Sequence, residues 1–360
     1  MVSQVSPSAS SFAPTIPIVD MKLLEHPTTR TAFFHDLAKG LSVGFFGIVN
    51  PDIDLETICE GYAAFDTFFK SPLKEKMTMH DPKLNGQRGY IPGEIALGSK
   101  TSDKKEFVHV GRKGNLWPKH MDLEIPATRL FKALEKHANP ILEGIATILH
   151  QSPTFFTDKT KNGESLMRAL NYPPQPEGVI TAEAHTDIDL LSLIPYASED
   201  GLEVYLNDKW TPVVVPKKAF IFNVGDFLEV FSNGRCRSCI HRVVSKNPKV
   251  SRMSIPFFIH PTDDTLIKPL GLQIPRYPVG NRLEYLFLRL FCLGILAKEN
   301  EGQVIHGEFI KRISAMVLNN TAADSVKNWH VGFRIALDER QKASVNSERN
   351  KAIGNLRARL

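Results

Sequence analysis

The stretch AHTDIDLLSLIPY, residues 184–196, places two possible metal ligands, His185 and Asp187, two residues apart ahead of an apolar run. In an extended strand alternate side chains share a face, so His185, Asp187 and Asp189 are expected to point the same way. The segment CIHRVV offers a third ligand, His241. Two imidazoles and one carboxylate with open positions form the ligand set of non-haem Fe(II) oxygenases.

A His-X-Asp triplet by itself is a weak signal, because it marks a turn or a strand end more often than a ligand pair. Asp189 has the residue type and the position of a further ligand in this stretch. One strand can rarely turn three ligands toward a single ion, so we predict that Asp189 is solvated or hydrogen-bonded instead of bound to metal.

The segment CRSCIH suggests a rival metal site through Cys236 and Cys239. A haem attachment needs His directly after the second Cys, and Ile240 intervenes. A zinc cluster needs a second ligand pair, whereas Cys59 and Cys292 stand alone. We therefore predict both as small space-filling side chains, with Cys239 near the metal but not bound to it.

The segment SRMSIPFF places Arg252 and Ser254 on one face of an otherwise apolar strand. Burying a guanidinium is costly unless it meets an anion, and its forked donors suit a carboxylate. For an isolated arginine, a salt bridge to an Asp or Glu of the same chain is the plainer interpretation.

Taken in order, His185-X-Asp187, His241 and Arg252-X-Ser254 resemble the iron- and 2-oxoglutarate-dependent dioxygenases of the isopenicillin N synthase-like branch. The resemblance runs from about Thr15 to Leu270. It also includes these segments: IPIVDM, GFFGIVN, FFKSPLKEKM, GQRGY and VGDFLEVFSNGRCRSCIHRVV.

The resemblance implies that His185, Asp187 and His241 hold Fe(II), with no catalytic residue beyond these ligands. It implies that Arg252 and Ser254 bind the far carboxylate of 2-oxoglutarate, that O2 is consumed, and that ascorbate stimulates turnover. Tyr172 in RALNYPP matches a tyrosine that often adds a hydrogen bond to the cosubstrate.

One position departs from the family pattern. Many relatives carry Asn two residues before that tyrosine, whereas this chain has Leu170 there and Asn171 displaced by one. Leu170 cannot make the corresponding hydrogen bond, so the near side of the cosubstrate is expected to be held differently.

The activity implied by the resemblance is oxidation of a C–H bond of a small molecule, by hydroxylation, desaturation or oxidative cyclisation, in specialised metabolism. Succinate and CO2 would be released. Two alternatives stay open at this point: an Fe(II) oxidase of the isopenicillin N synthase type that does not consume 2-oxoglutarate, and a zinc hydrolase or non-catalytic binding barrel with the same ligands.

Hydrophobic periodicity predicts helices and strands in separate parts of the chain. One helix is expected in TTRTAFFHDLAKGL, ended by Gly40; a second in DLETICEGYAAFDTFFK, closed by Ser71-Pro72; and a third over 128–150, kinked or divided by Pro140. A short strand is expected in TIPIVDM and a β-rich run in SVGFFGIVN. Further short strands are expected at 190–194, 202–206, 210–215, 219–224, 239–244 and 253–259.

These patterns predict a mixed α/β protein with a double-stranded β-helix, or jelly-roll, core flanked by helices. We expect a disordered lead-in (1–14), an N-terminal dioxygenase-type α/β region (15–120), a helix plus jelly-roll catalytic core (121–270) and a C-terminal helical region (271–360).

Composition and charge limit the classes of partner and the cellular locations that we expect. A net charge of +5 over 360 residues, without a run of five basic residues, argues against nucleic acid. The longest apolar run, 285–297, contains Arg289 and is too short to span a bilayer, so no membrane association is expected. Four cysteines and no secretory signal predict a cytoplasmic protein. The ending Ala358-Arg359-Leu360 resembles a relaxed peroxisomal signal, which is the weaker alternative.

Overall fold

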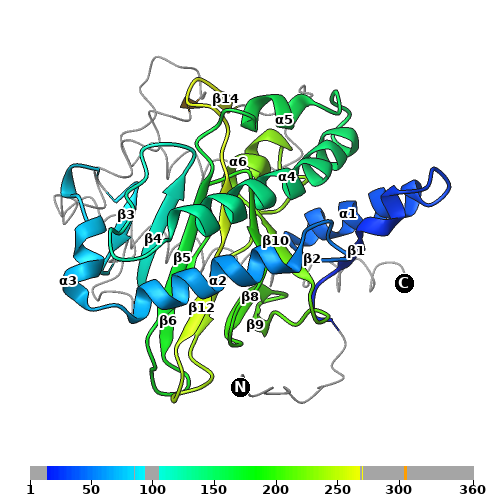
Figure 1. The fold of residues 1–360 in the computed structure, drawn as a ribbon. Helices are drawn as coiled ribbons and strands as arrows, with labels where there is room; N and C mark the ends of the chain where they lie inside the picture. The colour runs from blue at the N-terminus through cyan, green and yellow to red at the C-terminus, as the bar shows by residue number, and fades with distance from the viewer. Residues whose placement is uncertain (1–13, 85, 94–104, 268–269, 271–303, 306–360) are drawn as a thin grey trace.

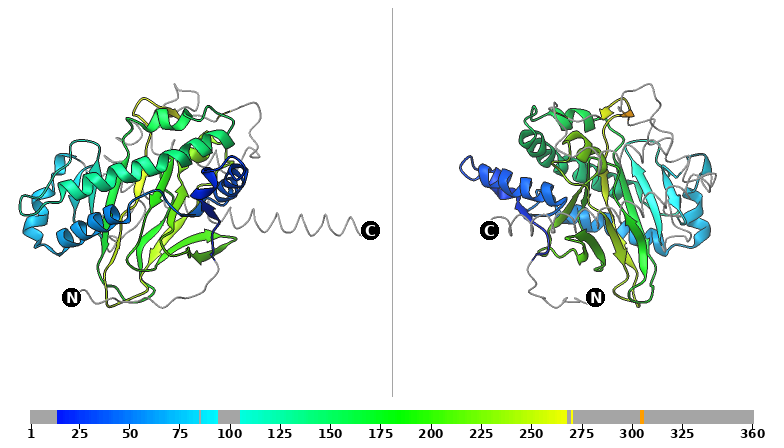
Figure 2. Two further views of the ribbon diagram at one scale, coloured as in Figure 1. Left: turned by 45° about the vertical axis from the view of Figure 1, so that its right-hand side comes forward. Right: turned by 180° about the vertical axis from the view of Figure 1, so that it is seen from behind.

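The computed structural model describes residues 14–84, 86–93, 105–267, 270 and 304–305. Two β-sheets face each other, and helices cover the outer face of the larger one (Figures 1 and 2). The architecture is therefore a mixed α/β fold with a jelly-roll core, as the short, closely spaced strands predict.

The larger sheet contains nine strands, in the order β1-β2-β10-β7-β13-β5-β4-β3 with β12 also paired to β5. Among the described pairings of this sheet, β1 and β2 are parallel and the other pairs are antiparallel. Their bounds are β1 Ile18–Asp20, β2 Phe45–Val49, β3 Gly89–Ile91, β4 Glu106–Gly111, β5 Leu166–Tyr172, β7 Leu191–Ile194, β10 Phe220–Val224, β12 Arg252–Ser254 and β13 Phe257–Ile259.

The smaller sheet has the order β6-β11-β8-β9 and is antiparallel throughout. Its bounds are β6 Ile180–His185, β8 Leu202–Leu206, β9 Lys209–Pro212 and β11 His241–Val244. A separate pair joins β14 (Leu266–Ile267) to β15 (Val304–Ile305).

Helices on the large sheet enclose the main apolar core, while a smaller core lies between the two sheets. The helices are α1 Arg30–Val43, α2 Leu55–Lys70, α3 Leu73–Lys76, α4 Glu124–Ile148, α5 Phe155–Thr160 and α6 Asp226–Phe231. Phe107 and Leu170 from the large sheet meet Val204 and Val243 from the small one. This inner layer also carries the polar side chains of the site.

Two helices differ from their predicted bounds. Helix α1 continues past Gly40 to Val43 and ends at Gly44, whose φ of 91° is left-handed. Gly40 is small because the helix packs on Phe46, whose Cβ lies 2.7 Å from where a Gly40 Cβ would stand. Helix α4 is not divided at Pro140, because the carbonyl that loses its partner belongs to Lys136, an exposed residue that water can reach.

The predicted strand over 253–259 is two strands, β12 and β13, interrupted at Ile255-Pro256. Proline has no N–H to donate to a sheet, which accounts for the interruption. The strand expected from His185 onward also breaks: β6 ends at His185, and β7 begins only at Leu191.

Several predictions fall on other parts of the chain. The lead-in before residue 14, the C-terminal helical region apart from 304–305, and the Ala358-Arg359-Leu360 ending lie outside the described residues. Within the described residues, every helix is too short or too polar to cross a membrane.

Candidate metal centre

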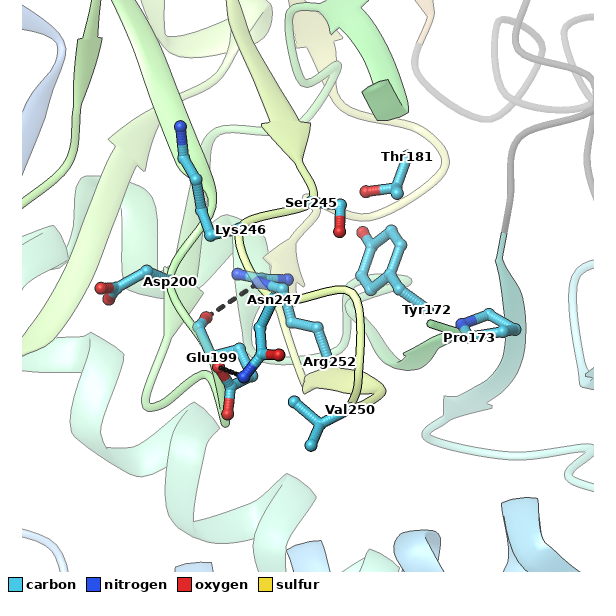
Figure 3. A pocket seen from close by; sticks show the side chains of 10 residues that line it. All are labelled: Tyr172, Pro173, Thr181, Glu199, Asp200, Ser245, Lys246, Asn247, Val250 and Arg252. Atoms are coloured by element: carbon cyan, nitrogen blue, oxygen red, sulfur yellow. Dashed lines mark hydrogen bonds between the residues drawn. The ribbon is translucent and has the colours of Figure 1, made fainter. Parts of the chain in front are cut away.

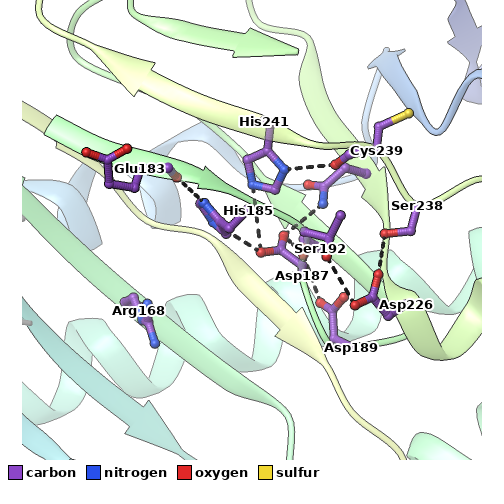
Figure 4. A network of polar contacts seen from close by, with 12 residues as sticks. Arg168, Glu183, His185, Asp187, Asp189, Ser192, Asp226, Ser238, Cys239 and His241 are labelled. Carbon is purple, nitrogen blue, oxygen red and sulfur yellow. Dashed lines mark hydrogen bonds and ion pairs between the residues drawn. The ribbon is translucent and has the colours of Figure 1, made fainter. Parts of the chain in front are cut away.

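Three predicted ligands come together at one end of the small sheet. His185 ends β6, His241 begins β11, and the two residues are register partners. Asp187 lies just beyond β6. The Nε2 atoms of His185 and His241 are each 3.7 Å from Asp187 Oδ1, and the three ligand atoms lie within 4.8 Å of one another (Figure 4).

The backbone orients both imidazoles. Nδ1 of His185 lies 2.7 Å from the carbonyl of Glu183, and Nδ1 of His241 lies 3.2 Å from the carbonyl of Cys239. A carbonyl only accepts, so each Nδ1 carries a hydrogen, and in the neutral ring Nε2 is the nitrogen with the lone pair. Both lone pairs are thus available on the side where Asp187 lies.

The second oxygen of Asp187 is held from the large sheet. Its Oδ2 accepts hydrogen bonds from Ser192 Oγ at 2.5 Å and from Asn223 Nδ2 at 2.8 Å. Ser192 on β7 and Asn223 on β10 are register partners, so they present their side chains to the same face. Asp187 Oδ1 is left to face the two histidines.

Asp189 is hydrogen-bonded, which is one of the two predicted outcomes, and it is buried instead of solvated. It is not part of the ligand cluster. Its Oδ2 lies 2.8 Å from Ser192 Oγ. Burial, followed by the nearby charge of Asp187, raises the pKa of Asp189 well above its ordinary value. A hydroxyl has one hydrogen, so a protonated Asp189 donates to Ser192 while Ser192 donates to Asp187.

The predicted face-sharing of His185, Asp187 and Asp189 along one strand is wrong, because residues 186–190 bend instead of pairing. The first amides of α6 hold this bend: Asp226 N–H donates to the Asp187 carbonyl at 2.8 Å and Phe227 N–H to the Asp189 carbonyl at 3.1 Å. The side chain of Asp226 also accepts from Thr186 and from Ser238, which precedes β11.

The protonation states suit a divalent cation. Desolvation by the surrounding protein, followed by the charge of the His241 imidazole, lowers the pKa of His185 to about 4, so the ring is neutral at pH 7. Burial acts to raise the pKa of Asp187, but the two histidines, Ser192 and Asn223 outweigh it and lower that pKa. Neutral imidazoles and an ionised carboxylate are the forms that bind metal.

A pocket lined by Arg252 and Tyr172 lies on β12 and β5, which are register partners at these two residues (Figure 3). Arg252 is 8% exposed, and its Nε donates to the Glu199 carbonyl at 3.0 Å. Its guanidinium carbon lies 5.4 Å from the centre of the Tyr172 ring. Among the described residues, no carboxylate forms an ion pair with Arg252.

Alternation along β5 explains the displaced asparagine. Leu170 and Tyr172 face the layer between the sheets, and Ser254 is the register partner of Leu170. Asn171 faces the other way and donates to Glu106 Oε1 at 2.8 Å. Asn171 therefore cannot take over the hydrogen bond that Leu170 lacks.

Comparisons with known proteins agree with this geometry. Residues 163–261 match the family model of the 2OG-Fe(II) oxygenase superfamily, and residues 16–126 match that of the non-haem dioxygenase in morphine synthesis N-terminal region. A solved putative 2OG-Fe(II) oxygenase family protein from Caulobacter crescentus is 30% identical, with a TM-score of 0.69, covering 84% of this chain and 98% of that one.

The chain belongs to the 2OG-Fe(II) oxygenase superfamily.

Curated relatives of this oxygenase are more distant in sequence. The leucoanthocyanidin dioxygenase of Petunia hybrida is 28% identical, covering 77% of this chain and 69% of the relative. The 2-oxoglutarate-dependent dioxygenase caaD of Aspergillus niger is 29% identical, covering 68% of this chain and 84% of the relative. The protein is thus a 2-oxoglutarate-dependent dioxygenase, with Fe(II) as its metal and O2 as cosubstrate. The alternative of an oxidase without 2-oxoglutarate is not favoured.

The two cysteines of the CRSCIH segment are not ligands in the cluster. Cys236 and Cys239 are both buried and free, and they pack into the two separate cores. The Cys239 thiol lies 2.9 Å from the carbonyl of Val43, and the Cys239 carbonyl accepts a hydrogen bond from His241 Nδ1. Neither is in the group of residues that could hold a metal ion.

The sequence analysis did not predict the residues that orient Asp187. Ser192 in LLSLI and Asn223 in FIFNV are single polar residues inside apolar strands. A buried polar side chain needs a partner, and that is the signal by which both could have been found. Asp226 had no comparable signal, because an aspartate directly after a glycine is typical of a turn.

Proposed function

We propose that His185, Asp187 and His241 are the three protein ligands of Fe(II) in this oxygenase. The observation that carries the proposal is the convergence of two Nε2 lone pairs and one carboxylate oxygen, each fixed by a hydrogen bond at the ligand's other polar atom. Three ligands on one side leave the other side of the ion open for cosubstrate and O2.

Arg252 is proposed to bind the far carboxylate of 2-oxoglutarate, with Ser254 and Tyr172 beside it. The support is a buried guanidinium whose described neighbours supply a carbonyl and an aromatic ring but no ion pair. A dicarboxylate with one end at the metal would complete that missing pair, since a buried guanidinium favours a bidentate anion.

When bound, the iron and 2-oxoglutarate supply the oxidising chemistry, in which O2 is consumed, succinate and CO2 are released and a substrate C–H bond is oxidised. The residues of the chain itself position the metal ligands and limit the access of water. Ser192 and Asn223 hold Asp187, two backbone carbonyls hold the imidazoles, and the apolar layer between the sheets limits the access of water.

The substrate is proposed to be a small molecule of specialised metabolism that undergoes hydroxylation, desaturation or oxidative cyclisation. Support comes from the names of the relatives, which include leucoanthocyanidin dioxygenase and gibberellin 20 oxidase. The absence of a nucleic-acid partner and the cytoplasmic location stay predictions.

The decisive experiment follows succinate formed from 2-oxoglutarate by the purified protein supplied with Fe(II) and ascorbate, with Zn(II) in a parallel reaction. Activity with iron alone excludes the zinc hydrolase and the non-catalytic barrel. Asp187→Ala and His241→Ala should each abolish succinate formation while their circular dichroism stays that of the parent. Near-normal activity in either variant contradicts the ligand assignment.

A further inference from the structure

A cationic subsite lies on the face of the large sheet that is turned toward the small sheet, near the ligand cluster (Figure 4). It consists of Arg168 on β5, His109 on β4 and the rings of Phe107 and Phe258. Neither the metal ligands nor the residues proposed for 2-oxoglutarate include any member of this group.

Strand register places Arg168 on the inner face of the large sheet. Arg168 shares its face of β5 with Leu170 and Tyr172, which pack into the core between the sheets. Its register partner is His109, which shares a face of β4 with Phe107. Arg168 and Phe258 are both only partly buried, so solvent or a ligand can reach part of each side chain.

The same register relates Arg168 to the metal cluster. Phe258 on β13 pairs with Ser192 on one side and with Leu166, two residues before Arg168, on the other. Strands β5 and β7 are thus separated by one strand, so their backbones are roughly 10 Å apart. Ser192 holds Asp187, and Figure 4 draws Arg168 on the opposite side of the cluster from Ser238.

The guanidinium of Arg168 is held in a fixed orientation. Its Nε–H donates to His109 Nε2 at 2.6 Å, and His109 Nδ1 lies 2.6 Å from the Gly86 carbonyl, so His109 is neutral. The guanidinium carbon lies 4.7 Å from the centre of the Phe107 ring and 5.4 Å from that of Phe258. Stacking and the hydrogen bond to His109 reduce the rotamer freedom that binding a ligand would otherwise remove.

A second cation lies on the same pair of strands. Lys105 directly precedes β4, the strand that carries Phe107 and His109 and pairs with β5. The nearby Glu106 faces away, where it binds Lys76, Tyr90 and Asn171. Two cations and apolar rings beside the site suit an acid with an apolar or unsaturated body.

We infer that Arg168, held by His109 and framed by Phe107 and Phe258, is the residue that binds the carboxylate of an acidic substrate and so sets which C–H bond faces the metal. This inference rests on the proposed function, because it deepens the substrate class of the same site.

The experiment compares acids with their uncharged methyl esters. Benzoate, cinnamate, 3-phenylpropanoate and octanoate, each beside its ester, are titrated by calorimetry into the protein loaded with Mn(II) and 2-oxoglutarate, so that no turnover is needed. The parent protein should bind at least one acid about tenfold or more tightly than its ester. Arg168→Met should remove that preference, Arg168→Lys should keep part of it, and Arg129→Met, a surface control on α4, should keep all of it.

Three results overturn the inference: no acid binds the parent, acid and ester bind equally, or Arg168→Met keeps the preference. The acid and ester comparison in the parent, together with Arg168→Lys, keeps the test decisive if Arg168→Met fails to fold. Binding through Arg168 without succinate formation contradicts the proposed function only. Iron-dependent succinate formation without Arg168-dependent binding contradicts the substrate class only.

Discussion

At the scale of single residues, the site depends on side chains that touch the ligands rather than on the ligands alone. Asp187 has one oxygen fixed by Ser192 and Asn223 and the other directed at two imidazoles. The outer hydrogen bonds choose the rotamer of the carboxylate before metal arrives, which lowers the entropy that binding must overcome.

Ser192→Ala should weaken metal binding about 10- to 100-fold, because the variant removes the hydroxyl that orients Asp187 and leaves Asp189 without that partner. Calorimetric titration with Mn(II) measures the effect. Ser42→Ala, at an exposed hydroxyl of α1, is the matched control and should bind like the parent. Unchanged affinity in Ser192→Ala would show that Asn223 alone orients the carboxylate.

Arg252→Leu should raise the KM for 2-oxoglutarate steeply, since loss of one partner of a buried charge contact costs about 2–5 kcal/mol. Metal affinity should change little, because Arg252 contacts none of the three ligands by any described hydrogen bond or ion pair. Steady-state succinate formation at varied 2-oxoglutarate separates the two effects. An unaltered KM would place the cosubstrate carboxylate elsewhere.

At the scale of elements, the N-terminal helix α2 supports the pocket of Arg252. The hydroxyl of Tyr62 donates to the Tyr196 carbonyl at 2.6 Å and accepts from the Ile255 amide at 3.2 Å. Ile255 follows Ser254, and Tyr196 precedes Ala197, which bridges to Ser254. One hydroxyl from α2 therefore joins the two segments on either side of Ser254.

Tyr62→Phe should lower the free energy of unfolding by about 1–3 kcal/mol, because the buried Ile255 amide loses its partner. It should also raise the KM for 2-oxoglutarate several-fold without changing Mn(II) affinity, since the ligand cluster is held from β7, β10 and α6 instead. Urea denaturation and the kinetic titration test both parts. A parallel loss of metal affinity would indicate general loosening of the fold.

At the scale of the whole molecule, the site connects the two sheets. His185 and His241 belong to the small sheet, while Ser192 and Asn223 reach Asp187 from the large one, which also carries Arg252. A metal ion with its cosubstrate would therefore link the layers of the jelly roll, and its binding free energy would add to the stability of the fold.

Mn(II) with 2-oxoglutarate should raise the melting temperature by several degrees, because a ligand at 100 times its dissociation constant stabilises the native state by about 2.7 kcal/mol. Asp187→Ala should lose this increase while melting close to the metal-free parent. Differential scanning calorimetry gives both values. An equal increase in the variant would mean that the ion binds at another place.

The sequence predicted several strands of the core, among them β2, β7, β8 and β10, and the order of the site residues, because period-two alternation and short turn signals are local properties. It did not predict β4 or β5. It did not predict that α1 runs past Gly40, and it left open whether Pro140 kinks or divides α4, which continues through Pro140. Those outcomes depend on Phe46 packing and on solvent at Lys136, which are tertiary contacts.

By itself, the sequence determined which side chains could hold a metal and an anion, since His185, Asp187, His241 and Arg252 follow from residue type and order. Only the tertiary structure decided how they meet. The bend after β6, held by the amides of α6, turns Asp187 toward both histidines although no strand carries it there. The pairing of β5 with β4 likewise brought Arg168 to His109, because contacts between distant segments are set by the packing of the whole chain.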